Sequence, residues 1–274
     1  MPHFTASDDT RLFYQDWGTG RPIVLLTMWA LGTEMWEYQV PALVDAGFRC
    51  VLPDRRGQGR SDVPGRGYDY DTLADDVAAL LDHLDLTDVT LVGPSMGGGE
   101  VIRCLTRHGS GRIGRIAIVS ATLPYLWGGE DNPEGAPPEV LAANFTVLRA
   151  DKPKFMGDFG QAFFQPHLGN PVSSEQVRWL VDYGSQTPTM VAIKLWESVF
   201  STDFRDELTK VDVPTLVVHG AADVNAPIDV TGRRTAALIP GCQYTEYPTG
   251  AHGMFVTHAQ QLTKDLLDFA GAPA

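Results

Sequence analysis

The chain is poor in cysteine and in basic side chains, and it has no long apolar run. Its 274 residues include 3 Cys, and 21 Lys and Arg stand against 34 Asp and Glu, which gives a formal net charge of −13. An acidic surface disfavours nucleic acid and anionic membranes, so we expect neither as a partner. No stretch approaches the ~18 apolar residues of a membrane span, and the start of the chain has no charged-then-apolar signal pattern.

Patterns that would hold a cofactor are also missing. Cys50, Cys104 and Cys242 are far apart in apolar surroundings, which indicates buried free thiols and a reducing compartment. The histidines have no paired spacing for a metal, and neither a Gly-x-Gly-x-x-Gly nor a phosphate-binding loop is present. We therefore expect a cytoplasmic protein without a metal or any other cofactor.

Apolar runs alternate with helical periodicity over most of the chain, which is typical of a parallel sheet covered by helices. Eight strands are expected, at residues 4–6, 11–17, 23–27, 48–52, 89–92, 116–119, 215–219 and 243–247. The first two form an antiparallel hairpin at a sheet edge. Helices are expected at residues 35–46, 70–84, 96–107, 227–238 and 259–269. The acids Asp75, Asp76 and Asp82 are predicted to form a solvated helix face.

The alternation stops between residues 121 and 208. This segment is rich in aromatic residues, and it has helical patterns at 140–148, 154–164, 174–183 and 188–199. We predict a helical cap inserted in a core that comprises residues 1–120 and 209–274. The predicted fold class is α/β, with a mostly parallel eight-stranded sheet, helices on both faces and the inserted cap.

One serine lies in the sequence Gly93-Pro94-Ser95-Met96-Gly97, between an expected strand and an expected helix. On a sharp strand-to-helix turn the two backbones nearly touch, which requires small residues two positions before and after the serine. Such a turn exposes the hydroxyl, and the N-terminus of the helix favours developing negative charge. The pattern predicts Ser95 as a nucleophile, and a Gly-rich turn that contains a serine by chance is the alternative.

A serine nucleophile needs a general base and an acid that orients the base. Asp223 and His252 each follow an expected strand, and functional groups of such sheets gather at the carboxyl ends of the strands. The chain order Ser95, Asp223, His252 is the order of the α/β-hydrolase triad. We therefore predict His252 as the base and Asp223 as the residue that orients it.

Four other polar residues near strand ends are predicted to be structural. His219 ends a buried strand and is expected to make a structural hydrogen bond. His258 and Asp229 are assigned to helices, and Asp54 is assigned to a charge network with the arginines that follow it.

An oxyanion hole needs two backbone N–H donors. We expect one from Met96, which follows the nucleophile, and one from Trp29, in the loop after the strand at 23–27. The substrate pocket is expected to be apolar and aromatic, lined by Pro94, Leu126, Trp127, Phe145, Phe159, Phe163, Phe200 and Met254. Such walls favour small or aryl esters over charged substrates, and ordinary core packing is the alternative for Trp29 and for each aromatic residue.

The chain resembles the arylesterase and cofactor-free haloperoxidase, or perhydrolase, branch of the α/β-hydrolases. The matching segments run from near the N-terminus to the last helix, and they include residues 54–57, 91–99 and 251–253. The resemblance implies hydrolysis of small carboxylic esters through an acyl-serine, with peracid formation from hydrogen peroxide as a side activity. It also implies that no haem or metal takes part and that the chain forms a homo-oligomer.

Four positions depart from this resemblance. Thr27 and Met28 stand where the family has His-Gly, and Met in place of Gly restricts the tight loop before Trp29. Pro94 stands where an aromatic residue is common, which predicts a stiffer turn and more space beside Ser95. Ala30 stands where haloperoxidase-like members tend to have Pro, which favours an esterase.

The leading prediction is a serine esterase that acts on a small-molecule ester. Lactone or lactam hydrolysis by the same residues is the enzymatic alternative. A protein that binds a ligand on the same fold without turning it over is the alternative from another class.

Overall fold

The computed structural model describes residues 2–170 and 172–271 and contains one eight-stranded sheet. The strand order is β1-β2-β4-β3-β5-β6-β7-β8, and β2 runs antiparallel to both of its neighbours while the other neighbouring pairs are parallel. The strands are β1 (His3–Thr5), β2 (Arg11–Gly18), β3 (Pro22–Leu25), β4 (Arg49–Pro53), β5 (Val89–Pro94), β6 (Ile113–Val119), β7 (Thr215–Gly220) and β8 (Gln243–Tyr247). The predicted mostly parallel sheet with an antiparallel edge hairpin is confirmed.

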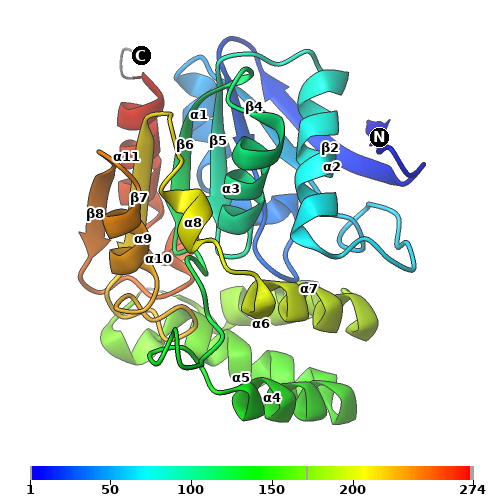
Figure 1. The fold of residues 1–274 in the computed structure, drawn as a ribbon, viewed down its shortest axis with the longest axis vertical. Coiled ribbons are helices and arrows are strands. Elements are labelled where there is room, and N and C mark those ends of the chain that lie inside the picture. Colours follow the sequence, from blue (N-terminus) through cyan, green and yellow to red (C-terminus); the bar gives the residue numbers. More distant parts are fainter. Residues whose placement is uncertain (1, 171, 272–274) are drawn as a thin grey trace.

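Helices cover both faces of this sheet (Figure 1). Helices α2, α3 and α9 pack on one face, and α1 and α11 pack on the other. The core helices are α1 (Val40–Asp45), α2 (Tyr70–His83), α3 (Gly97–His108), α8 (Arg205–Leu208), α9 (Gly232–Leu238), α10 (Met254–Thr257) and α11 (Ala259–Gly271), with the 3-10 helix η1 (Thr33–Trp36).

The inner strands are apolar at successive positions because both of their faces are buried. In β3, Ile23 and Leu25 join the core layer under α1 and α11, whereas Val24 joins the layer under α2 and α3. Side chains of a strand alternate between the two faces of a sheet, so a strand covered on both sides needs an unbroken apolar run. This burial fixes the carboxyl ends of β5, β7 and β8, where the predicted site residues follow.

The segment between β6 and β7 forms the predicted helical cap. Its helices are α4 (Pro138–Ala150), α5 (Lys152–Phe164), α6 (Ser174–Gly184) and α7 (Thr189–Ser201), with the 3-10 helix η2 (Pro166–Leu168). Figure 1 shows these helices together at one end of the sheet. Several polar contacts tie the cap to the core, and two of them reach segments near β3: Tyr183 Oη donates to Glu34 at 2.5 Å, and the Trp29 indole N–H donates to the Ala192 carbonyl at 2.9 Å.

Two predicted helices are shorter than their apolar patterns suggested. The helix expected at 35–46 is split into η1 and α1, because Pro41 has no backbone N–H and is accommodated in the first turn of a helix. The helix expected at 227–238 begins only at Gly232, so Asp229 precedes α9 and does not belong to it. Asp229 instead pairs with Arg233 at 2.5 Å.

The prediction that Asp76 lies on a solvated helix face is wrong. Asp76 is 8% exposed and accepts two hydrogen bonds from the buried Arg56 guanidinium, at 2.6 and 2.7 Å. A guanidinium can bind a carboxylate with two parallel bonds, which makes burial of both charges possible. Helical periodicity groups Asp76 with the other polar residues of its helix. It cannot show that the partner, Arg56, comes from a loop 20 positions earlier in the chain.

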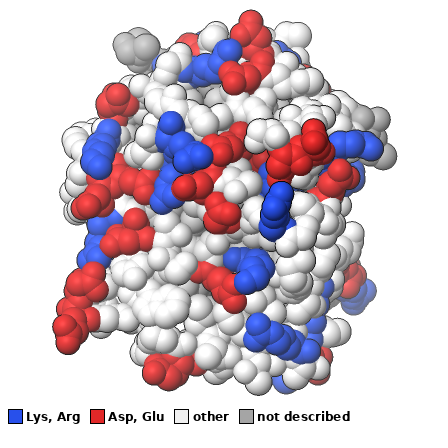
Figure 2. Space-filling model, turned by 45° about the vertical axis from the view of Figure 1, so that its right-hand side comes forward, with Lys and Arg blue, Asp and Glu red and all other residues white. Residues whose placement is uncertain are grey.

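The described residues include no helix that is long and apolar enough to cross a membrane. The cysteines carry free thiols, with Cys50 and Cys104 buried and Cys242 half-buried. On the face drawn in Figure 2, acidic side chains lie close to Lys and Arg side chains over much of the surface.

Candidate active site

Ser95 occupies a strained turn between β5 and α3. Its φ is +51°, in the left-handed region that residues with a side chain rarely adopt, and its N–H donates to the Val119 carbonyl at 2.9 Å. A Cβ atom at Gly93 would lie 2.5 Å from the Gly97 carbonyl oxygen, so the strand and the helix approach as closely as the sequence predicted. The turn holds the serine hydroxyl away from both backbones.

The structure brings Ser95, His252 and Asp223 into one hydrogen-bonded chain. His252 Nε2 lies 3.0 Å from Ser95 Oγ, and His252 Nδ1 lies 2.7 Å from Asp223 Oδ2. All three residues are at most 5% exposed. These distances match those needed for a base that accepts the serine proton while an acid orients its ring.

Asp223 is held as a carboxylate by several donors. Its Oδ1 accepts the N–H groups of Asn225 at 2.9 Å and Ala226 at 2.8 Å. Burial acts to raise the pKa of Asp223, but the neighbouring His252 and His219 outweigh burial and bring the pKa below its usual range. Asp223 is therefore ionised when it faces His252.

His219, predicted to be structural, has its own partners. Its Nε2 lies 2.8 Å from the Ala226 carbonyl, and it lies 3.5 Å from Asp223 Oδ2. Asp54 forms the predicted charge network, since it accepts Arg60 Nε at 3.1 Å and the Thr33 N–H at 2.9 Å. His258 caps the short helix α10 and lies 3.1 Å from the Thr249 hydroxyl.

The N–H groups of Met96 and Trp29 are free to bind an oxyanion, because neither donates to an acceptor among the described residues. The carbonyl of Met28, on the other side of the same peptide as the Trp29 N–H, accepts from Arg55 Nη1 at 3.1 Å and from the Leu31 N–H at 3.3 Å. The C=O and N–H of a trans peptide point in opposite directions. Holding the carbonyl therefore directs the Trp29 N–H away from Arg55.

The loop accommodates Thr27 and Met28 without left-handed backbone at either position. The residue that takes positive φ is Ala30, at +60°, within the turn closed by the Leu31 N–H. The Met28 side chain is buried, and its N–H points at the Met35 sulfur at 3.4 Å. The loop thus keeps its tight turn although the glycine expected from the resemblance is absent.

Arg55 connects this loop to the helix that follows the serine. Its Nη2 donates to the Thr27 carbonyl at 2.6 Å, and its Nε pairs with Glu100 of α3. Both side chains are at most 5% exposed. Burial raises the pKa of Glu100, while the adjacent guanidinium opposes this shift. One buried ion pair thus links the loop that carries the Trp29 N–H to the helix that follows Met96. The spacing of residues along the chain did not predict this pair.

A cavity of about 60 Å³, the inner chamber, lies against Ser95 and His252. Four predicted pocket residues line it, namely Leu126, Phe159, Phe163 and Phe200. Sequence reasoning missed five others, which reach the cavity from separate segments: Met28, Thr122, Trp196, Val199 and Asn225. Asn225 could have been found from its place two residues after Asp223 in a strand-end loop.

The other four predicted pocket residues lie outside the inner chamber. Phe145 and Trp127 pack in the core of the cap, where Phe145 meets the Trp196 ring at 6.1 Å. Met254 is fully buried in the opposite core layer. Pro94 ends β5 opposite Val119 and is not among the residues that line the inner chamber. The apolar character of these residues indicated that they pack against other side chains. It did not show whether they line the cavity at Ser95.

A second and larger cavity of about 670 Å³, the outer chamber, adjoins the inner one. Five residues line both chambers: Leu126, Phe159, Trp196, Phe200 and Asn225. The exposed side chains of Val140, Val147 and Val224 line the outer chamber. The arrangement gives a wide, mainly apolar entrance, with Glu134, Lys154 and Asp158 also on its wall, that narrows to a small space at the serine.

Comparison with known proteins identifies relatives over the full chain. The model of the alpha/beta hydrolase fold family matches residues 21–259. The non-heme chloroperoxidase CPO-A1 of Kitasatospora aureofaciens is 40% identical, spanning 98% of this chain and 99% of that protein. The bifunctional esterase/perhydrolase DCH of Acinetobacter calcoaceticus is 32% identical over 98% of this chain and 99% of its own length. The crystal structure of a bromoperoxidase from Bacillus anthracis matches with a TM-score of 0.93 and 36% identity, over 99% of this chain and 100% of that one.

Proposed function

Because the chain belongs to the alpha/beta hydrolase fold family and is a hydrolase, we propose that Ser95, His252 and Asp223 form the catalytic triad of a serine esterase. The observation that carries this proposal is the continuous chain of hydrogen bonds from Ser95 Oγ through His252 to Asp223. In this scheme His252 Nε2 takes the serine proton as Oγ attacks the ester carbonyl. His252 then gives that proton to the leaving alcohol, and water releases the acid from the acyl-serine.

The negative charge on the carbonyl oxygen is assigned to the N–H groups of Met96 and Trp29. Donors already aimed at the developing charge stabilise the transition state without reorganisation. Their freedom from other acceptors and the fixed Met28 carbonyl support this role. The 60 Å³ inner chamber suits a short acyl group, and the outer chamber suits the alcohol portion.

The test is turnover of p-nitrophenyl acetate by the wild type and by Ser95→Ala. We expect the substitution to lower kcat by about 10⁴-fold or more, and Asp223→Asn by about 10³-fold or more, because the histidine loses its orienting carboxylate. Ser120→Ala is the matched control, since Ser120 is a buried serine at the end of β6 whose hydroxyl has no hydrogen-bond partner among the described residues. Equal rates in wild type and Ser95→Ala would show that Ser95 is not the nucleophile.

A second activity of the same site is peracid formation, favoured by the relatives named as an esterase/perhydrolase and a chloroperoxidase. Hydrogen peroxide would replace water in the last step: its oxygen attacks the acyl carbonyl, the acyl group leaves as the peracid, and Ser95 regains its proton through His252. Peracetic acid production from acetate and hydrogen peroxide tests this step. It is expected in the wild type and absent in Ser95→Ala.

A further inference from the structure

The wall of the inner chamber is apolar except at a few positions, and most of its polar groups already have partners. Ser95 and His252 bind each other, and the Trp29 indole N–H is bound to the Ala192 carbonyl. The Thr122 hydroxyl lies beside that of Tyr70. Among the described residues of this chamber, Asn225 alone has a buried side-chain polar atom without a hydrogen-bond partner.

Asn225 Oδ1 is buried and has no hydrogen-bond partner among the described residues. Buried polar atoms of proteins are nearly always hydrogen-bonded, and leaving one unpaired is unfavourable. The support that this residue gives to Asp223 comes from its backbone N–H, which any residue at position 225 supplies. The amide side chain therefore has no structural task that explains its presence on an apolar wall.

The position of Asn225 indicates which part of a substrate it meets. It lines both the inner and the outer chamber, so this residue stands where the two join. It also lies on the histidine side of Ser95, because its N–H binds Asp223 Oδ1 while Asp223 Oδ2 binds His252. In ester hydrolysis the histidine must reach the oxygen of the leaving alcohol. Asn225 thus adjoins the alcohol portion as it passes into the outer chamber.

We infer that Asn225 is a specificity-determining residue that binds a hydroxyl group on the alcohol portion of the ester. The preferred substrates are then short-chain monoesters of diols or other hydroxylated alcohols. A hydroxyl group suits either orientation of the amide, because it can donate to Oδ1 or accept from Nδ2. This inference rests on the proposed esterase function.

The experiment compares matched esters that differ in one hydroxyl group. Monoacetates of ethylene glycol, 1,3-propanediol and 1,4-butanediol are paired with propyl, butyl and pentyl acetate, and kcat/KM is measured for each with the wild type and with Asn225→Leu. Leucine keeps the side-chain size but offers no hydrogen bond. We expect the diol-to-alkyl ratio of at least one pair to fall by about 3- to 10-fold in Asn225→Leu, the effect of one neutral hydrogen bond.

The ratio is measured within each preparation, so it does not depend on how much of a variant folds. Comparing ratios between variants also cancels the intrinsic reactivity of each ester. Gln260→Leu is the matched control, because this exposed amide of α11 lines neither chamber and the substitution should leave every ratio within about twofold of the wild type.

Unchanged ratios for all three pairs in Asn225→Leu, with esters still hydrolysed, would overturn the role of Asn225 and leave the esterase proposal standing. Absence of turnover of every acetate by the wild type would instead overturn the esterase proposal, and this inference would fall with it.

Discussion

At the scale of single residues, Arg55 is a side chain that connects separate segments around Ser95. It holds the carbonyl groups of Thr27 and Met28 and pairs with Glu100. The planar guanidinium serves these acceptors from separate N–H groups in fixed directions. It therefore sets the plane of the Met28–Trp29 peptide and, through it, the aim of the Trp29 N–H.

Arg55→Lys is expected to lower kcat for p-nitrophenyl acetate by about 10- to 100-fold with little change in KM. A lysine ammonium cannot hold the two carbonyls and Glu100 in the same geometry, so one oxyanion donor loses its alignment, and that donor acts mainly in the transition state. Steady-state kinetics of the purified variant measure the split between kcat and KM.

Arg56→Lys is the matched control for this prediction. Arg56 is equally buried and pairs with Asp76 and Asp8, but it makes no hydrogen bond to the Thr27 or Met28 carbonyl. The Arg56→Lys substitution should lower the melting temperature while kcat stays close to that of the wild type. A similar fall in kcat for both variants would mean that Arg55 acts only through general stability.

The residues predicted from the sequence were those whose roles follow from local position. Ser95, Asp223 and His252 each follow a strand, and parallel strands end at one edge, so chain order was enough to bring them together. Arg55 makes contacts that join distant segments, for which a single sequence carries no signal beyond residue type.

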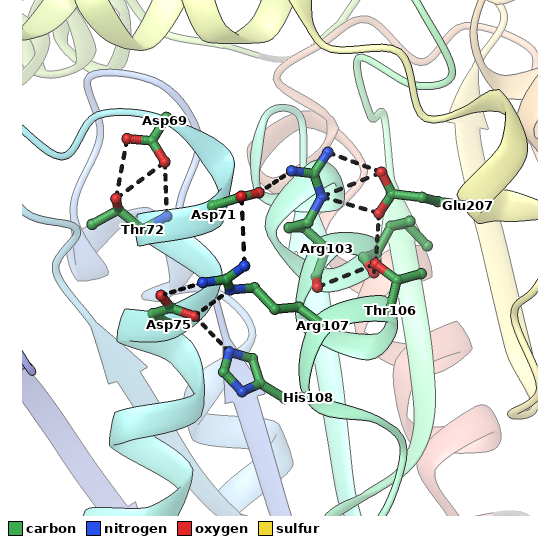
Figure 3. A network of polar contacts seen from close by, with 10 residues as sticks. Asp69, Asp71, Thr72, Asp75, Arg103, Thr106, Arg107, His108 and Glu207 are labelled. Atoms are coloured by element: carbon green, nitrogen blue, oxygen red, sulfur yellow. Dashed lines mark hydrogen bonds and ion pairs between the residues drawn. The ribbon is translucent and has the colours of Figure 1, made fainter.

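At the scale of elements, a partly exposed polar network links α2, α3 and α8 (Figure 3). Arg103 of α3 pairs with Asp71 of α2 and binds Glu207 of α8 at 2.9 Å. Asp75 of α2 accepts Arg107 Nε at 2.6 Å and lies 2.7 Å from His108 Nε2. Because α8 follows the cap, this network fixes the point at which the chain returns to the core.

Asp75→Asn is expected to lower the free energy of unfolding at pH 7 by about 1 kcal/mol or less, since the carboxylate is partly exposed. The hydrogen bond from Arg107 holds the pKa of Asp75 below its usual range. A carboxylate with a lowered pKa in the folded state contributes stability above its unfolded pKa, and that contribution is lost as pH falls through the folded value. The difference from wild type should therefore shrink below about pH 4.

Urea unfolding at pH 7, 4 and 3 measures this difference. The control is Asp268→Asn, whose partner Lys264 lies one turn away on the exposed face of α11, and which should change stability by about 0.5 kcal/mol or less at pH 7. A difference for Asp75→Asn that is the same at pH 7 and pH 3 would contradict the lowered pKa.

The elements themselves were largely predictable, because strand and helix periodicities repeat in a consistent order. All eight strands and the four cap helices were found near their predicted positions. The errors have local causes. Pro41 divides one expected helix, and the short helices α8 and α10 have too few residues to show a period. Asp76 was placed on the wrong surface because its partner, Arg56, lies in a loop.

At the scale of the whole molecule, acidic residues outnumber basic ones, and many acidic side chains take part in ion pairs. Several surface arginines each bind two carboxylates, as Arg103 and Arg205 do. Figure 2 shows both signs of charge interspersed over the face it draws. Interspersed charges of both signs avoid a large surface field of one sign.

Because the cysteine thiols are largely covered, their reactivity measures how readily the core opens. Burial raises the pKa of Cys50 and that of Cys104 to about 12 each, and both lie in the core, in β4 and α3. Burial also raises the pKa of the half-buried Cys242, whose thiol donates to the Ala236 carbonyl at 3.3 Å. The thiolate is the reactive form, so a raised pKa and a covered sulfur both slow reaction.

Native protein at pH 8 is therefore expected to react with a disulfide reagent such as DTNB at Cys242 alone, and slowly, whereas guanidinium-unfolded protein should react at all 3 cysteines. Absorbance of the released thiolate follows the reaction. Cys242→Ser is the control, and it should abolish the slow reaction of the native protein. Rapid reaction of two or more thiols in the native wild type would show that the core layer containing Cys50 or Cys104 opens far more readily than its burial implies.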